Sequence, residues 1–241
     1  MKKSSTFLIF LFVLSLAGNA QQQTLVIKKL TGDYYVFTTW RTYQGTAFPS
    51  NGMYLVTNAG AVLIDCPWDT TQLQPLLDSI KAKHKKEVIV HIATHSHSDR
   101  SAGLEYYTRK GIKTYSTLQT DSFSVARKEK RAKYLLTKDS TFQVGQYHFQ
   151  TFYPGPGHTV DNIVVWFDQQ KILYGGCFVK STEAKDLGNL ADANAKAWPS
   201  SIQNILKKFG EPKYVIPGHQ DWSNNKSLQY TLELLKQKNK K

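Results

Sequence analysis

Three side chains of metal-binding type stand at alternate positions in the segment THSHSDR, residues 94–100. His95, His97 and Asp99 offer imidazole and carboxylate donors within this short run. The run continues directly from EVIVHIATH, whose apolar residues predict a buried strand over 87–95. A loop at a strand end can present functional side chains from a rigid scaffold. The segment is therefore a candidate metal site.

Three further donors follow other predicted strands. They are His158 in PGPGHTVDN, Cys177 in YGGCFVK and His219 in VIPGHQD. A glycine directly precedes each of them, and a residue without Cβ lets the backbone turn tightly and approach a site closely. This shared arrangement predicts that the three donors converge on one place.

Imidazole, thiolate and carboxylate are the ligands that zinc prefers, and six of them divide into two tetrahedral sets, each completed by solvent. Taken singly, a histidine is more often a hydrogen-bonded structural residue, and Asp99 could cap a helix near 101–110. Six donors at four strand ends favour a metal site over coincidence. We expect the three other histidines to be surface or packed residues; they are His84, His91 and His148.

The elements that must position these donors alternate along the chain. Strand patterns, rich in β-branched and aromatic residues, occur at 24–30, 34–40, 52–65 (a hairpin), 87–95, 112–116, 147–154, 162–167, 171–176 and 214–217. Helical patterns occur at 70–83, 101–110, 118–131, 197–209 and from about 225. Strands and helices alternate in both halves, which predicts an α/β fold of two sheets packed face to face with helices outside, a four-layer αββα sandwich.

The first twenty residues have the pattern of a secretory signal. Two lysines precede the apolar run TFLIFLFVLSLAG, and small residues stand before QQQ. The run is too short for a comfortable membrane span, and no cysteine follows it to carry a lipid anchor. We therefore expect a signal peptide at 1–20, a single domain at 21–241 and a periplasmic location.

The formal charge of +13 raises the question of nucleic-acid binding. The lysines are dispersed, and no basic run interleaves with aromatic residues as in single-strand binders. We expect a solvated basic surface and no nucleic-acid partner. We also expect a monomer, because no long apolar surface pattern remains once the sandwich is built.

Cys66 and Cys177 are the two cysteines of the chain. In an exported protein the default expectation is one disulfide between them. Their residue types and spacing leave this alternative open beside a metal-binding role for Cys177.

The run HSHSDR, taken with GPGHTVDN, GGC and GH, resembles the metallo-β-lactamases over essentially the whole chain after the signal. Within that family it is similar to the first subclass of class B, which includes chromosomal carbapenemases of flavobacteria. The resemblance implies two zinc ions, one held by His95, His97 and His158 and the other by Asp99, Cys177 and His219. A thiolate that binds zinc cannot also form a disulfide, so Cys66 is then expected to be a free, buried thiol.

Arg100 distinguishes this chain from other members of the wider superfamily. Thioesterase-like members and the third lactamase subclass carry H-x-H-x-D-H and use the last histidine on the second metal, whereas here an arginine stands at that position. The second subclass has asparagine at the position of His95. The resemblance therefore implies that Cys177 completes the second site.

Further residues match the family pattern. Lys180 corresponds to a lysine that binds the substrate carboxylate, and Asn189 to an asparagine near the lactam carbonyl. Asp65 resembles a carboxylate that steadies the ligand loop. Residues 42–52 correspond to a mobile flap, from which Tyr43 and Phe48, together with Trp68 of the next loop, are candidates for apolar contact.

The function that the resemblance implies is zinc-dependent hydrolysis of penicillins, cephalosporins and carbapenems by a metal-bound hydroxide, with Asp99 orienting the nucleophile. Two rivals remain. A superfamily hydrolase acting on thioesters, lactones or phosphodiesters is disfavoured by Arg100 and by the Cys177, Lys180 and Asn189 set. A periplasmic zinc-buffering protein would bind metal without turnover and gives no role to Lys180.

Overall fold

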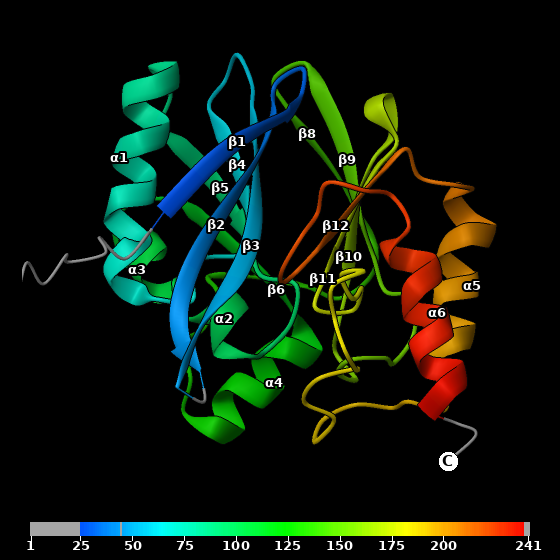
Figure 1. Cartoon of the computed structure of the whole chain (residues 1–241). Coiled ribbons are helices and arrows are strands. Elements are labelled where there is room, and N and C mark those ends of the chain that lie inside the picture. Colours follow the sequence, from blue (N-terminus) through cyan, green and yellow to red (C-terminus); the bar gives the residue numbers. More distant parts are fainter. Residues whose placement is uncertain (1–24, 44, 239–241) are drawn as a thin grey trace, which may run out of the picture.

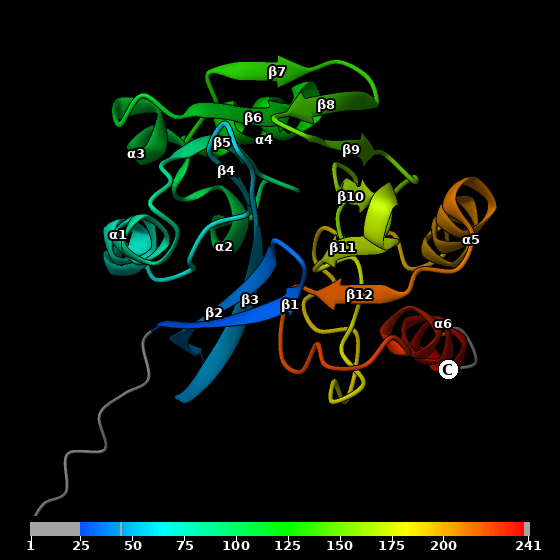
Figure 2. The same ribbon diagram turned by 90° about the horizontal axis from the view of Figure 1, so that it is seen from above.

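The computed structural model describes residues 25–43 and 45–238 of the chain. Two sheets lie face to face in the middle of the molecule, and helices flank them on both outer sides (Figure 1). Figure 2 shows the same arrangement from above, with α1 and α3 outside one sheet and α5 and α6 outside the other. The predicted four-layer αββα sandwich is confirmed.

The first sheet has seven strands in the order of the sequence. They are β1 (Leu25–Thr31), β2 (Tyr34–Tyr43), β3 (Thr46–Val56), β4 (Ala61–Ile64), β5 (Val88–Ile92), β6 (Lys113–Thr117) and β7 (Tyr134–Leu136). The first four strands form an antiparallel meander, and the pairs from β4 to β7 are parallel. Helices connect the parallel strands, as parallel pairing requires.

The second sheet has five strands in the order β12-β11-β10-β9-β8. They are β8 (Ser140–Val144), β9 (Tyr147–Phe152), β10 (Val164–Phe167), β11 (Ile172–Gly176) and β12 (Tyr214–Pro217). The strands from β8 to β11 pair antiparallel, and β12 joins β11 in parallel. Cys177 and His219 therefore emerge at the same edge of the sheet.

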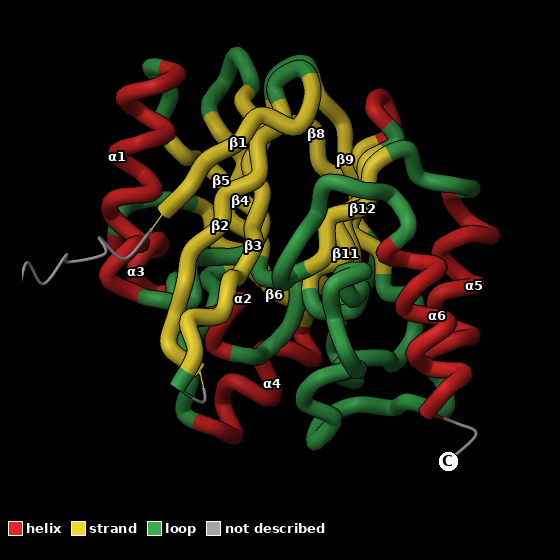
Figure 3. The backbone as a smooth tube through the Cα atoms, viewed as in Figure 1, coloured by secondary structure: helices red, strands yellow, loops and turns green. Residues whose placement is uncertain are grey.

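The helices are α1 (Leu73–His84), α2 (Ser98–Ser101), α3 (Leu104–Arg109), α4 (Leu118–Arg127), α5 (Trp198–Phe209) and α6 (Ser227–Lys238). Coloured by secondary structure, α1 and α3 flank the sheets on one outer side and α5 and α6 on the other (Figure 3). The side chain of Thr117 caps α4 by accepting a hydrogen bond from the Thr120 backbone N–H. Pro199 lies in the first turn of α5, where its missing N–H costs no helical bond, and Gly210 follows the last residue of that helix.

Alternation along the strands divides the core into layers. In β4, Val62 and Ile64 pack between the sheets, while Ala61 and Leu63 face α1. In β10, Val165 and Phe167 pack between the sheets, while Val164 and Trp166 contribute to the cluster under α5 and α6. Both faces of these strands are buried, which explains their continuous apolar runs.

Several sequence-based boundaries need correction. Residues 42–52, expected as a flap, belong largely to the hairpin of β2 and β3, and Tyr43 pairs with Thr46 across its tip. The helix expected over 118–131 ends at Arg127, because Lys128 adopts a left-handed conformation that terminates it. The helix expected at 101–110 is divided into α2 and α3. Strands β7 and β8 were not predicted.

The expected signal peptide at 1–20 lies outside the described residues. Among residues 25–43 and 45–238, no helix combines the length and apolar character needed to cross a bilayer.

His91 lies in β5 as a packed residue, as predicted, with no exposed surface. Its ring meets the edge of Tyr107 at 4.8 Å between centroids, and neither ring nitrogen has a hydrogen-bond partner within the described part of the chain. Burial lowers the pKa of His91 to about 3. The side chain is therefore held in its neutral form at neutral pH.

We expect the metal-free protein to lose stability on acidification because of His91. The unfolded chain takes up this proton near pH 6.5 and the folded chain only near pH 3, so acid favours unfolding between these values. At pH 4.5 the loss is roughly 2–3 kcal/mol relative to pH 7. Urea unfolding at both pH values should show a correspondingly smaller loss in His91→Leu. His148→Leu is the matched control, because His148 is exposed. An equal acid loss in wild type and His91→Leu would contradict this account.

Candidate metal centre

The loop that carries the first three donors is fixed from two sides. Strand β5 ends at Ile92, and Thr94 donates both its backbone N–H and its hydroxyl to the Asp65 carboxylate, at 2.8 and 2.9 Å. Two residues further on, the Ser96 backbone N–H donates to Asp161 at 2.9 Å. His95 and His97 are thus presented by a backbone anchored to two buried carboxylates.

The other three donors come from the second sheet. His158 lies in the loop between β9 and β10, Cys177 directly follows β11, and His219 lies two residues beyond β12. The glycine before His219 is required by close packing, because a Cβ on Gly218 would lie 2.7 Å from the Cys177 backbone nitrogen. Gly176 has φ +52°, a backbone conformation that residues with a side chain rarely adopt.

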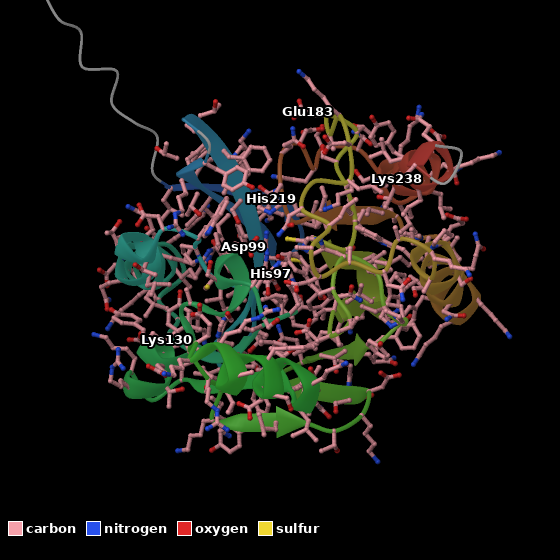
Figure 4. All side chains as sticks on the ribbon, turned by 90° about the horizontal axis from the view of Figure 1, so that it is seen from below. His97, Asp99, Lys130, Glu183, His219 and Lys238 are labelled. Carbon is pink, nitrogen blue, oxygen red and sulfur yellow. The ribbon has the colours of Figure 1, made fainter. Side chains whose placement is uncertain are left out.

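All six predicted donors come together between the two halves of the molecule. Three overlapping groups each have donor atoms within 4.8 Å of one another: His95, His97 and Asp99; His95, His158 and Cys177; and Asp99, Cys177 and His219. Viewed from below, His97, Asp99 and His219 gather at the centre of this face, whereas Lys130, Glu183 and Lys238 lie far from them (Figure 4). The overlap makes the six donors one continuous cluster.

Distances within the cluster are short. Cys177 Sγ lies 3.3 Å from Asp99 Oδ2 and 3.3 Å from His219 Nε2, and the last two atoms are 3.1 Å apart. His97 Nδ1 and His158 Nε2 are 3.2 Å apart, and the three rings of His95, His97 and His158 have centroids separated by 4.8–5.1 Å.

The protonation states suit metal binding. Burial lowers the pKa of His95 and of His158 well below the usual range, so both rings are neutral and keep a lone pair. Burial opposes the charge on Asp99, but Arg100 and His219 outweigh it and hold the pKa of Asp99 well below its usual value. Burial raises the pKa of the Cys177 thiol, which Arg100 offsets in part. A bound cation would reverse this, because a coordinating thiol loses its proton.

Arg100 lies directly beneath the Asp99, Cys177 and His219 group and is fully buried. Its Nε donates to Asp99 Oδ2 at 3.1 Å and to Cys177 Sγ at 3.2 Å. The remaining nitrogens donate to the backbone carbonyls of Asn51 and Gly218, at 2.6 and 2.8 Å. The guanidinium therefore neutralises the acidic donors and joins the loops that carry them.

Asp65 occupies the place expected from the resemblance, under the ligand loop. Its carboxylate is fully buried and accepts hydrogen bonds from Thr94 and from the Tyr174 hydroxyl, at 2.8 Å in the latter case. Burial raises the pKa of Asp65 to about 6, while Arg100 and these hydrogen bonds act in the opposite direction.

Aromatic side chains lie against the His219 side of the cluster. The rings of Phe48 and Trp68 lie 5.2 and 5.8 Å from the His219 ring, measured between centroids. Tyr43 packs on Trp68 at 5.7 Å. The hairpin is also tied to the cluster through its backbone, because His219 Nδ1 donates to the Pro49 carbonyl at 2.9 Å.

Lys180 and Asn189, the two residues expected to contact substrate, both follow Cys177 in the chain. Lys180 follows Cys177 by three residues, and its Nζ lies 5.5 Å from the centre of the Trp198 ring. Asn189 is exposed on the loop after it and accepts a hydrogen bond from the Ala191 backbone at its Oδ1, at 3.0 Å. No hydrogen bond joins Asn189 to the six donors in the described part of the chain, and its contact with substrate stays a prediction.

Sequence reasoning missed two carboxylates beside the histidines. Asp192 Oδ2 accepts a hydrogen bond from His97 Nε2 at 2.8 Å, and Asp161 holds the Ser96 backbone. Asp161 stands in the HTVDN motif and could have been suspected from it. Asp192 lies 95 residues from His97, with no pattern to connect them.

The cysteines do not form a disulfide. Cys66 and Cys177 are both free and buried, as the metal-binding interpretation requires. Cys66 accepts a hydrogen bond from the Gly103 backbone and packs beneath α3, apart from the donor atoms.

The donor set fits a divalent metal. Neutral imidazoles, a carboxylate and a thiol are the chemical groups that hold zinc. The buried His95 Nε2 has no hydrogen-bond partner within residues 25–43 and 45–238, although buried ring nitrogens are normally satisfied. A cation among these donors would satisfy it.

Comparisons with known proteins agree with this chemistry. Residues 45–219 match the sequence model of the metallo-beta-lactamase superfamily. The chain is 44% identical over 237 residues to the metallo-beta-lactamase type 2 of Elizabethkingia meningoseptica. This alignment covers 98% of this chain and 95% of that relative. The chain is 38% identical over 239 residues to the metallo-beta-lactamase IND-1 of Chryseobacterium indologenes, covering 99% and 100%.

Solved structures are similar in fold as well as in sequence. The metallo-beta-lactamase IND-7 superposes with a TM-score of 0.86 at 37% identity, covering 90% of this chain and 100% of that one. The metallo-beta-lactamase from Pontibacter korlensis gives 0.85 at 38% identity, covering 88% and 99%. The similarity thus extends over nearly all of the described residues.

Proposed function

This chain belongs to the metallo-beta-lactamase superfamily, and from that premise we infer that it is a hydrolase that opens the amide bond of β-lactam antibiotics and so confers resistance to them. The observation that carries this function is the convergence of donor atoms from Asp99, Cys177 and His219 within 3.1–3.3 Å of one another. The rings of His95, His97 and His158 lie beside them. We propose zinc as the metal, with two ions per chain.

The chain's own residues would divide the two ions between them. His95, His97 and His158 would hold one ion, and Asp99, Cys177 and His219 the other. Zinc held there would lower the pKa of a bound water to about 7 and would polarise a carbonyl oxygen, which supplies a nucleophile and an electrophile at neutral pH.

Asp99 would orient the attacking water. Its contacts with Arg100, Cys177 and His219 all fall on Oδ2, which leaves Oδ1 to accept a hydrogen bond from that water. Arg100 keeps the carboxylate ionised and therefore able to accept. The same carboxylate thus has both a metal-binding and an orienting oxygen.

Two residues would position the substrate. The Ala191 backbone N–H occupies Asn189 Oδ1, so the amide nitrogen is free to donate to the oxyanion that develops on the lactam carbonyl. Lys180 would pair with the substrate carboxylate. Phe48 and Trp68, which are both partly exposed beside His219, would contact apolar substituents, and we propose that penicillins, cephalosporins and carbapenems are all accepted.

We further propose that the protein is exported to the periplasm by its first twenty residues and acts there as a monomeric single domain comprising 21–241. The sequence pattern of the N-terminus supports export. No nucleic-acid partner or lasting membrane anchor is part of this proposal.

Turnover of nitrocefin and imipenem, combined with zinc quantification, tests the function. We expect hydrolysis of both compounds and about two zinc ions per chain. Metal uptake without hydrolysis would favour the zinc-buffering alternative. Hydrolysis confined to thioesters, lactones or phosphodiesters would favour another superfamily activity.

Replacing Lys180 by alanine should raise KM for imipenem roughly 10- to 100-fold with little change in kcat. A hydrogen bond between charged groups contributes about 1.5–3 kcal/mol, and a contact made equally in ground and transition states appears in KM. Steady-state kinetics measure the effect. Lys185→Ala, an exposed lysine on the following loop, is the control and should match wild type. An unchanged KM in Lys180→Ala would remove this residue from the site.

A further inference from the structure

Helix α4 is connected to the loop that carries His95 and His97, here called the histidine loop. The connection starts at the C-terminal end of the helix and runs from Arg127 through Asp192 to His97. Arg127, in the last turn, donates from Nη2 to Asp192 Oδ1 at 3.0 Å. The other oxygen of Asp192 accepts the hydrogen bond from His97 Nε2 at 2.8 Å. Each carboxylate oxygen therefore has its own partner.

We propose that Arg127 is a positioning residue of the metal centre: it fixes the Asp192 carboxylate so that Oδ2 meets His97 Nε2, and thereby directs His97 Nδ1 at the metal. The proposal rests on the proposed function only in taking His97 as a ligand. It assigns Arg127 a role that depends on Asp192 and not on contact with substrate.

His97 needs such help more than the neighbouring histidines do. His95 and His158 are buried, whereas 20% of the His97 side chain is exposed. With Nε2–H donated to Asp192, the tautomer is fixed and the lone pair is on Nδ1. That atom lies 3.2 Å from His158 Nε2, within the donor cluster.

Asp192 cannot hold its own orientation by burial. Its side chain is 35% exposed and lies on the loop between Lys180 and α5. A carboxylate there with one hydrogen bond could rotate toward water. Arg127 supplies the second contact from a separate element, which fixes the plane of the carboxylate.

Arg127 is itself held in place. Its guanidinium lies 5.3 Å from the centre of the Phe123 ring, one helical turn earlier. A planar guanidinium stacks on an aromatic face and donates from fixed directions, which an ammonium group does not reproduce. Packing on Phe123 thus holds Arg127 in an orientation in which its Nη2 donates to Asp192.

The same helix contacts the histidine loop at its other end. Thr120, in the first turn, donates its hydroxyl to Asp161 Oδ2 at 2.8 Å, and that oxygen also accepts from the Ser96 backbone. Helix α4 therefore holds the loop at two places, through Asp161 on the backbone and through Asp192 on the His97 ring. This second connection supports a positioning role for the helix as a whole.

Zinc affinity, measured by competition with a chromophoric chelator on the full chain, tests the proposal independently of β-lactam turnover. Arg127→Ala should weaken zinc binding at the site that contains His97 about tenfold. Asp192→Ala should weaken it roughly 10- to 100-fold, which is the range for groups that orient a metal ligand. Arg127→Lys should fall between Arg127→Ala and wild type. The double variant should be no weaker than Asp192→Ala alone, because Arg127 acts through Asp192.

Arg131→Ala is the matched control. It removes another arginine–aspartate pair from the same part of the chain, with Asp121, at 2.7–2.8 Å, and should change zinc affinity by less than about twofold. Circular dichroism of the metal-free variants establishes that each is folded. Wild-type affinity in Arg127→Ala, or effects of Arg127→Ala and Asp192→Ala that multiply in the double variant, would overturn the proposal. A wild-type protein that binds zinc without hydrolysing β-lactams would refute the proposed function and leave this test intact.

Discussion

Exhaustive treatment with EDTA should reduce nitrocefin and imipenem turnover by on the order of a thousandfold or more, and added zinc should restore it. The reason is that the side chains at the centre can hold a cation but offer no thiolate nucleophile without one. His95 and His158 are neutral, and the Cys177 thiol is protonated when no cation is bound. Steady-state assays before chelation, after chelation and after zinc addition measure the effect. Circular dichroism should show that the metal-free protein stays folded.

One pair of residues could supply a different chemistry, and the same assay distinguishes it. Cys177 Sγ lies 3.3 Å from His219 Nε2, a separation typical of a thiol and its general base. Its burial and raised pKa argue against a thiolate nucleophile. Turnover that persists after chelation and is abolished by a thiol-alkylating reagent would transfer the chemistry to this pair and refute the metal mechanism.

Replacing Arg100 by methionine should lower the free energy of unfolding of the metal-free protein by about 3–5 kcal/mol. Methionine keeps much of the length of the side chain but leaves buried Asp65 and Asp99 without their counter-charge. The carbonyls of Asn51 and Gly218 also lose their donor. Urea unfolding of the metal-free variant measures the loss, and the melting temperature should fall by on the order of 10 °C.

Two further variants bracket the Arg100 prediction. Arg109→Met removes an exposed arginine whose nearest acidic neighbour, Glu105, is 3.9 Å away, and should change stability by less than about 0.5 kcal/mol. Arg100→Lys restores the charge but not the five donors, so its stability should lie between Arg100→Met and wild type. An unfolding midpoint for Arg100→Met equal to that of wild type would show that Asp65 and Asp99 do not depend on this guanidinium.

The donor cluster could be predicted from the sequence because each donor follows a strand with a clear local pattern. Mainly apolar runs at 88–92 and 172–176 give strands that are largely buried, and their ends fix where His95 and Cys177 emerge. The resemblance then divided the six donors into two sets. Lys180 and Asn189 came from the resemblance alone, and the structure leaves their contact with substrate as a proposal.

The missed features depend on tertiary contacts. Strand β7 has only three residues, Tyr134–Leu136, and is stabilised by pairing with β6. The flap expected at 42–52 came from the resemblance, but Pro49 and Gly52 lie in β3, paired with Trp40 and Phe37 of β2. The connection from Arg127 through Asp192 to His97 joins three distant segments, so no local periodicity could reveal it.

The order of the donors along the chain determines when the protein can acquire metal. His219 lies beyond β12, which joins the second sheet only by pairing with β11, and 124 residues separate it from His95. An incomplete or unfolded chain offers little more than the short H-x-H-x-D run, so it competes poorly for scarce ions. With the proposed zinc ions, metal capture would therefore follow folding and would draw on the ions of the compartment where folding finishes.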